Sequence, residues 1–230
     1  IVYDENVPFY LRELIKLTEE QINRAREMDD LPPYERATHG KEAWNEWVQK
    51  YRDRWLDRRE SSDCVRMALR PDGERCTIWF CDGLAGKCDE YELIYGNYEG
   101  YWFPCEVDFS RAIFKTAVNF SYAKFLGRGW FQGSQFEQKA RFNETHFGMG
   151  ALFCNAAFKE NTSFRKAQFM GDGSFQNTVF GWGVDFIEVQ FHEDAGFSTA
   201  VFVDGTYFKD AKFYKTCSYE NAVFFRLVYW

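Results

Sequence analysis

The stretch that decides the fold is FNETHFGMGALFCNAAFKENTSF, residues 142–164. Its phenylalanines follow one another at alternating steps of five and six residues. The alternation runs without a break from Phe109 to Phe213, and its extension reaches Tyr219 and Phe224. Of the 25 phenylalanines in the chain, 21 lie on this series, and the exceptions are Phe9, Phe80, Phe103 and Phe225. So strict a spacing indicates an internal repeat.

A small residue stands two positions before each aromatic of the series, as Ala156 does before Phe158 and Thr162 before Phe164. Side chains of a strand alternate between two faces, so both members of such a pair point to the same side. The residues between the pairs, such as 159–161, are turn formers. The pattern therefore predicts short strands, joined by turns, with a Phe and a small residue facing inward.

An α-helix does not explain this spacing, because steps of five and six walk around a helix of 3.6 residues per turn instead of forming a stripe. A propeller blade needs a period of about 40 residues. Residues 106–225 instead resemble the pentapeptide-repeat family, whose motif is a small residue, a polar residue and a central Leu or Phe.

The resemblance implies a mainly β fold, a right-handed quadrilateral β-helix. Every second unit of this chain carries one extra residue, so the true repeat is one step of five plus one step of six, and two such repeats make a four-sided coil. We expect about five and a half coils, with the extra residue bulging one corner in two.

Composition and charge narrow the classes of function. The chain is 20% aromatic, which excludes a disordered protein, and no apolar stretch is long enough to cross a membrane as a helix. The net charge of −7 belongs to residues 1–105, since residues 106–230 hold 13 acidic and 13 basic side chains. Because neither part is basic, we expect no direct binding of nucleic acid.

Residues 1–105 are expected to form an N-terminal helical and Cys-rich capping domain, and residues 106–230 the β-helix with a C-terminal apolar cap. Two amphipathic helices are predicted, over 9–28 and 41–60, separated by a Pro-containing segment. The second helix carries one aromatic face, made of Trp44, Trp47, Val48, Tyr51 and Trp55. This face either packs on the first helix and the open end of the β-helix or forms an exposed groove for a partner.

Five of the seven cysteines lie in the first part, at Cys64, Cys76, Cys81, Cys88 and Cys105. Free thiols, one or more disulfides, and a zinc site made by the first four are all open, although no pair has zinc-knuckle spacing. Cys154 and Cys217 stand alone on the β-helix, which favours a reducing compartment such as a bacterial cytoplasm. The sequence begins at Ile1 without a basic and apolar leader, so we expect either a removed leader or a trimmed chain.

No motif of a catalytic, phosphate-binding or metal-binding class is present, and we expect neither an enzyme nor a cofactor. Of the three histidines, His146 and His192 flank series phenylalanines at outward positions, and His39 lies between the two predicted helices. We therefore expect the protein to function through an interaction surface instead of a catalytic site.

Two surfaces are candidate interfaces. One column of outward residues, with one residue from each coil, is apolar and consists of Ile113, Gln135, Ala157, Val179, Val201 and Val223. The column on the opposite side, from Lys124 through His146 to Lys212, is polar. An apolar sheet face should be covered, either by the N-terminal helices, which we favour, or by a second subunit or partner. The C-terminal residues Phe225, Leu227, Tyr229 and Trp230 form either a plug on the last coil or a dimer contact.

The sequence thus favours a structural or protein-interaction module on a rigid β-helix, with a protein partner or a homodimer. The family resemblance implies a second possibility, because some members mimic duplex DNA and bind type II topoisomerases, protecting them from quinolones. Mimicry needs a dense negative surface, which a β-helix with balanced charge does not favour. A third possibility is an enzyme or metal-binding protein that uses the Cys-rich segment.

Overall fold

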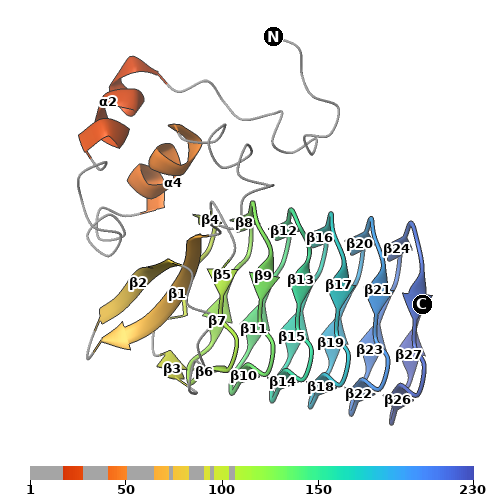
Figure 1. Ribbon diagram of the computed structural model, residues 1–230. Coiled ribbons are helices and arrows are strands. Elements are labelled where there is room, and N and C mark those ends of the chain that lie inside the picture. The colour runs from red at the N-terminus through yellow and green to blue at the C-terminus, as the bar shows by residue number, and fades with distance from the viewer. Residues whose placement is uncertain are drawn as a thin grey trace.

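The chain folds into a four-sided parallel β-solenoid of about six coils, with two helices at its N-terminal end (Figure 1). The computed structural model describes residues 18–27, 41–50, 65–72, 75–82, 91–93, 96–103 and 107–230. For residues 65–93 within these ranges it describes the backbone alone. Over the described residues, no helix is long and apolar enough to cross a membrane.

Each side of the solenoid is one sheet, and each coil contributes one short strand to each sheet. Sheet A contains β2 (Arg75–Asp82), β1 (Val65–Asp72), β5 (Val107–Asp108), β9 (Gly129–Trp130), β13 (Ala151–Leu152), β17 (Gly173–Ser174), β21 (Ala195–Gly196) and β25 (Cys217–Ser218). Sheet B contains β3 (Tyr91–Leu93), β6 (Ala112–Phe114), β10 (Gln135–Phe136), β14 (Ala157–Phe158), β18 (Val179–Phe180), β22 (Val201–Phe202) and β26 (Val223–Phe224).

Sheet C contains β7 (Val118–Asn119), β11 (Ala140–Arg141), β15 (Thr162–Ser163), β19 (Val184–Asp185), β23 (Thr206–Tyr207) and β27 (Val228–Tyr229). Sheet D contains β4 (Trp102–Phe103), β8 (Lys124–Phe125), β12 (His146–Phe147), β16 (Gln168–Phe169), β20 (Gln190–Phe191) and β24 (Lys212–Phe213). The chain visits the sheets in the order A, B, C, D, so sheet A faces sheet C across the core and sheet B faces sheet D.

Stacked phenylalanines fill the interior, as the spacing predicts. Phe142 lies over Phe164 with ring centroids 4.8 Å apart and planes 4° from parallel. Phe142 also meets Phe153, on the next sheet but one, edge to face at 81°. Offset stacks along the axis and edge contacts across it are the arrangements that aromatic quadrupoles prefer. The predicted aromatic core is confirmed, because the series side chains from Phe109 to Phe208 are all buried.

The small residues two positions before the series phenylalanines from Phe109 to Phe208 are buried as well. Where this residue is Ser or Thr, its hydroxyl donates to a backbone carbonyl, as Thr145 does to Phe120 and Thr178 to Phe153, both at 2.7 Å. A buried hydroxyl is costly without such a partner. Ser134, Thr162 and Thr206 donate instead to a carbonyl two or three residues earlier in their own coil, so each of these buried hydroxyls has an acceptor.

Alternate corners of each coil differ in the way the steps of five and six predict. In the five-residue step from Phe153 to Phe158, Asn155 has a φ of 59° and the Ala156 N–H donates to the Phe153 carbonyl at 3.0 Å. That geometry is a type II turn. A residue with positive φ recurs once in every half coil from Gly100 to Asn221, so the extra residue of the six-residue step lies in the other two corners of each coil.

The sheets begin before residue 106, where the domain boundary is expected. β3 pairs with β6 and β4 pairs with β8, both parallel. Tyr98 stacks on Phe120 at 4.8 Å and Phe103 on Phe125 at 4.6 Å, each one coil below its partner. The exclusion of Phe103 from the series is therefore wrong, because Tyr98 continues the steps of five and six where a search for phenylalanine alone stops.

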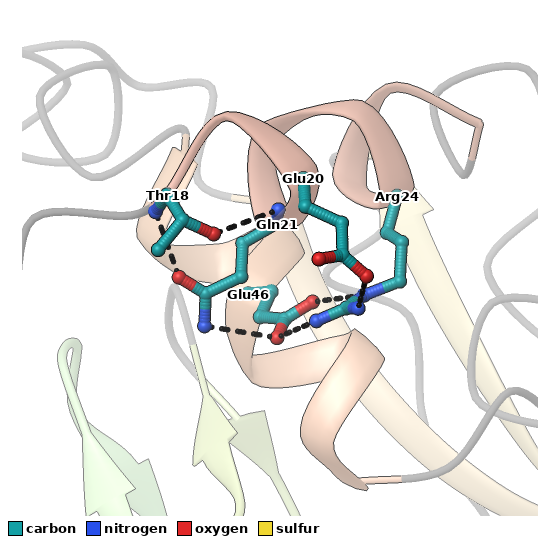
Figure 2. A network of polar contacts seen from close by, with 5 residues as sticks. All are labelled: Thr18, Glu20, Gln21, Arg24 and Glu46. Carbon is teal, nitrogen blue, oxygen red and sulfur yellow. Dashed lines mark hydrogen bonds and ion pairs between the residues drawn. The ribbon is translucent and has the colours of Figure 1, made fainter.

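The two described helices are α2 (Glu19–Glu27) and α4 (Lys41–Lys50), and the rest of the predicted spans lies outside the described residues. Thr18 and Gln21 form a capping box at the start of α2, with the Thr18 N–H donating to Gln21 Oε1 at 2.8 Å (Figure 2). Arg24 of α2 reaches Glu46 of α4 with two N–H donors, at 2.8 and 3.1 Å. This pair joins the two helices to each other.

α4 is fixed to the first described coil through its aromatic face. Trp44 and Trp47 are buried, and Trp44 Nε1 donates to the Trp102 carbonyl at 2.8 Å. Asn45 accepts from the Trp102 N–H and donates to the Gly100 carbonyl. This part of the predicted aromatic face is thus packed inside the protein, while Tyr51 and Trp55 lie outside the described residues.

Candidate interaction surfaces

The predicted apolar column lies on the outer face of sheet B in the predicted register. Parallel pairing places Ile113, Gln135, Ala157, Val179, Val201 and Val223 directly above one another. Val179 is 40% exposed and Val223 44% exposed, while Ile113 and Val201 are half-buried. Ile113 stands three coils from Val179, so only the three valines form a continuous group.

The C-terminal candidates extend this group around the corner from sheet B to sheet C. Phe225 is 67% exposed and Leu227 is 70% exposed, and Phe225 lies one coil above the exposed Val203. Tyr229 follows on the outer face of sheet C. We call Val179, Val201, Val203, Val223, Phe225, Leu227 and Tyr229 the apolar surface. The two predicted interfaces are therefore one continuous patch.

Trp230 has a different position. It lies 5.1 Å from Phe208 in a stacked arrangement, so it continues the interior series instead of facing outward from a sheet. Its side chain is 71% exposed.

Neither described helix covers the apolar surface. α2 and α4 lie at the N-terminal end beside β4 and β8 of sheet D, whereas sheet B lies on the opposite side of the solenoid (Figure 1). The expectation that the N-terminal helices cover the valines is thus wrong for the described helices. α4 is held at the first coil by Trp102, several coils away from Val179.

Charged side chains limit the apolar surface toward the N-terminus. Glu137, at the same corner, lies 2.9 Å from Lys159 Nζ and 3.5 Å from Lys115 Nζ. The hydrogen bond from Lys159 lowers the pKa of the Glu137 carboxyl, and Lys115 acts in the same direction. In the following coils Gly181, Val203 and Phe225 occupy the corresponding positions, so the corner changes from charged to apolar along its length.

Elsewhere on the β-helix, several acidic side chains pair with basic ones from the neighbouring coil. Examples are the ion pairs of Arg165 with Asp185 at 3.1 Å and of Lys166 with Glu188 at 3.7 Å, each between neighbouring coils. Such pairing places a positive group beside a negative one along the axis. The arrangement does not favour mimicry of a DNA duplex.

The histidines of the β-helix are outward residues without an arrangement typical of catalysis. Burial, followed by the charge of Lys124, lowers the pKa of His146, and burial lowers the pKa of His192, whose ring stacks on Tyr214. Both therefore favour the neutral form near neutral pH. His39 lies outside the described residues.

Among the residues whose side chains are described, no three His, Cys, Asp or Glu side chains come together as metal ligands. Cys154 and Cys217 are free thiols, and Cys154 Sγ lies 3.1 Å from Ser174 Oγ. Of the Cys-rich segment, Cys76 and Cys81 lie in β2, where the backbone alone is described, and Cys64, Cys88 and Cys105 lie outside the described residues.

A groove of about 600 Å³ lies on the outer face of sheet C and was not predicted from the sequence. Lys139 and Arg141 stand at one end, and Trp182 and Tyr207 at the other. Gly183 follows Trp182 directly, and Gly205 lies one coil above it, in the same coil as Tyr207. The segment Gly181-Trp182-Gly183, an exposed Trp between two glycines, is the only local sequence sign of this groove.

Comparison with known proteins supports the repeat. The family model described as pentapeptide repeats (9 copies) matches residues 106–146, and the same coil continues as a β-solenoid to Tyr229. No curated protein and no solved structure matches the chain.

Proposed function

Taking the chain as a pentapeptide-repeat β-helix protein, we propose that it is a non-enzymatic protein-interaction module whose rigid coils present the apolar surface to a second copy of the chain. The observation that carries this proposal is the exposure of Val179, Val223, Phe225 and Leu227 in one patch on an otherwise charged β-helix. Large exposed apolar patches of soluble proteins mark interaction sites.

The shape of the patch supports a second copy as the occupant. The valines of sheet B form a straight, uncharged column with one side chain per coil, about 4.8 Å apart. A two-fold axis perpendicular to this column places the valines of one copy against those of the other. Such a contact buries Val against Val and leaves the ion pairs of Glu137 in water, which avoids the cost of burying charge.

The proposal is tested by adding charge to the column. The double variant Val179→Lys, Val201→Lys is compared with Gln168→Lys, Gln190→Lys, which adds the same charge to sheet D on the opposite side. We expect the native chain and the Gln variants to show twice the mass of 27.3 kDa by light scattering, and the Val variants to show a single mass. All three should give the same circular dichroism spectrum.

Leu227→Lys provides a second test if the Val variants do not fold. Leu227 is 70% exposed, so its substitution should leave folding unchanged and still weaken the dimer. A native chain that stays at one chain mass at about 100 µM, a concentration far above the Kd of a stable dimer, contradicts the proposed occupant. A complex with a different protein that the Val variants lose would replace it with a hetero-partner.

A further inference from the structure

We propose that the groove on sheet C binds an acidic oligosaccharide that lies along the axis of the β-helix, with a carboxylate at Lys139 and Arg141 and a sugar ring on Trp182. The groove borders the apolar surface, because Tyr207 stacks on Tyr229 with ring centroids 4.7 Å apart. The residues that hold the ligand, Lys139, Arg141 and Trp182, lie outside the apolar surface, so the proposal does not depend on dimerisation.

The hollow itself comes from two glycines in neighbouring coils. Gly183 and Gly205 occupy the column that holds Lys139 and Asn161 in the two preceding coils, so side chains are missing there over two coils. The ring of Tyr207 lies over Gly205, where an added Cβ would stand 3.3 to 3.6 Å from it. No side chain of a neighbouring residue covers the backbone at Gly183, whereas the ring of Tyr207 covers Gly205. Trp182 borders the hollow beside Gly183.

Trp182 is placed to take the face of a ring. Its side chain is 59% exposed, although large aromatic side chains are usually well covered, and it stands between two glycines that leave it without bulky neighbours in the chain. An indole presents a broad apolar face and a single N–H donor. The apolar C–H face of a pyranose ring matches such a surface.

The other end of the groove is positive. Lys139 and Arg141 are exposed, neighbouring outward residues, and neither forms an ion pair with the carboxylates of the described chain. Arg165, by contrast, is already paired with Asp185 at 3.1 Å. A guanidinium and an ammonium side by side form a site for a carboxylate.

The middle of the groove offers hydrogen-bond partners for the hydroxyl groups of a sugar. Asn161 offers both a donor and an acceptor, and Asp204 uses Oδ1 for the Gly205 N–H, which leaves its other oxygen as an acceptor. The Asp204 carboxylate can therefore accept a hydrogen bond from a sugar hydroxyl. Trp182 and Arg141 are two coils apart, about 10 Å, so the ligand must span more than one sugar ring.

The test is calorimetric titration of the full chain with tetragalacturonate and with the neutral galactose tetramer of the same linkage. We expect the acidic oligomer to bind more tightly than the neutral one and to weaken as salt is added. Trp182→Ala should weaken both by about tenfold or more, and Arg141→Gln should remove the preference for the acidic oligomer.

Tyr214→Ala is the matched control, because Tyr214 is an exposed aromatic (56%) outside the groove. It should leave both affinities unchanged, as should Val179→Lys, which changes the apolar surface on sheet B and not the groove on sheet C. The proposal is overturned if neither oligomer binds, if Trp182→Ala binds as the native chain does, or if ATP binds more tightly than the acidic oligomer.

Discussion

Phe103 stacks on Phe125 with ring centroids 4.6 Å apart and ring planes 21° from parallel, which makes Phe103 a core residue of the first coil. Its neighbour Trp102 accepts the hydrogen bond from Trp44 of α4. The ring of Phe103 therefore supports both the end of the aromatic stack and the strand that holds the helices.

Replacing this ring should destabilise the whole chain. We expect Phe103→Ala to lower the free energy of unfolding by about 3–5 kcal/mol, because a fully buried ring is lost and a cavity remains. Urea unfolding followed by circular dichroism measures the change. Tyr214→Ala removes an aromatic side chain from an exposed position outside the apolar surface and should change stability little. Equal losses in both variants would contradict the placement of Phe103.

Gly173 should not tolerate even a methyl group. A Cβ at Gly173 would lie 2.6 Å from the ring of Phe191, which is held in its stack by Phe169 and Phe213. We expect Gly173→Ala to cost about 1–3 kcal/mol through overpacking. Gly196→Ala is the control, because its Cβ would meet nothing closer than Ser174 Oγ at 3.7 Å, and thermal unfolding should show it equal to or above the native chain.

Replacing Lys166 with glycine should stabilise the folded chain. Its φ of 57° is unfavourable for a residue with a Cβ, and its ion pair with Glu188 is exposed and long. We expect Lys166→Gly to raise the free energy of unfolding by up to about 1 kcal/mol, and Lys209→Gly, at an exposed position without positive φ, to lower it by about 0.5–1 kcal/mol. A loss of stability for Lys166→Gly would contradict this account of the corner.

Acid should weaken the contact between α2 and α4. The hydrogen bond from Arg24 lowers the pKa of the Glu46 carboxyl below its ordinary value of 4.5. A lowered pKa means that this pair stabilises the folded state fully above the ordinary value and loses that contribution as the pH falls through the lowered one. Near-ultraviolet circular dichroism of the tryptophans, recorded during urea unfolding at pH 7 and pH 3, should show the loss.

Glu46→Gln isolates this contribution. The variant should be less stable than the native chain at pH 7, and the difference between the two should shrink toward pH 3. A difference that stays constant with pH would assign the role of Glu46 to packing instead of charge.

The β-helix interior is predictable because every side of every coil has the same requirement: one aromatic and one small residue that point inward. A search for phenylalanine alone does not find Tyr98 and Trp230, although they stack on the series phenylalanines Phe120 and Phe208. The left-handed corners are hidden for another reason. Positions such as Arg111 and Lys166 are not typical turn residues, and closure of the coil imposes their φ.

The groove is harder to predict because it depends on the absence of side chains at stacked positions in neighbouring coils. Gly183 and Gly205 are separated in the sequence by a full coil, and only the stacking of β19 and β23 makes them neighbours. The exposure of the valines on sheet B likewise depends on where the helices pack, and this is decided by the contact of Trp44 with Trp102.

The interior and the surface of this protein repeat at different lengths. The core repeats with every half coil, as the positive-φ corners do, but an outward column returns to the same sheet only after a full coil, as Val179 and Val201 do. Loss of one half coil, a step of five with a step of six, would therefore keep every downstream ring in a stack and turn every downstream outward side chain to the opposite side. A whole coil can be gained or lost without moving any outward column to another sheet. Gain or loss of half a coil moves each downstream outward column to the opposite sheet and leaves the stacking of the core unchanged. In this architecture a single insertion or deletion can therefore move a surface to the opposite side of the β-helix.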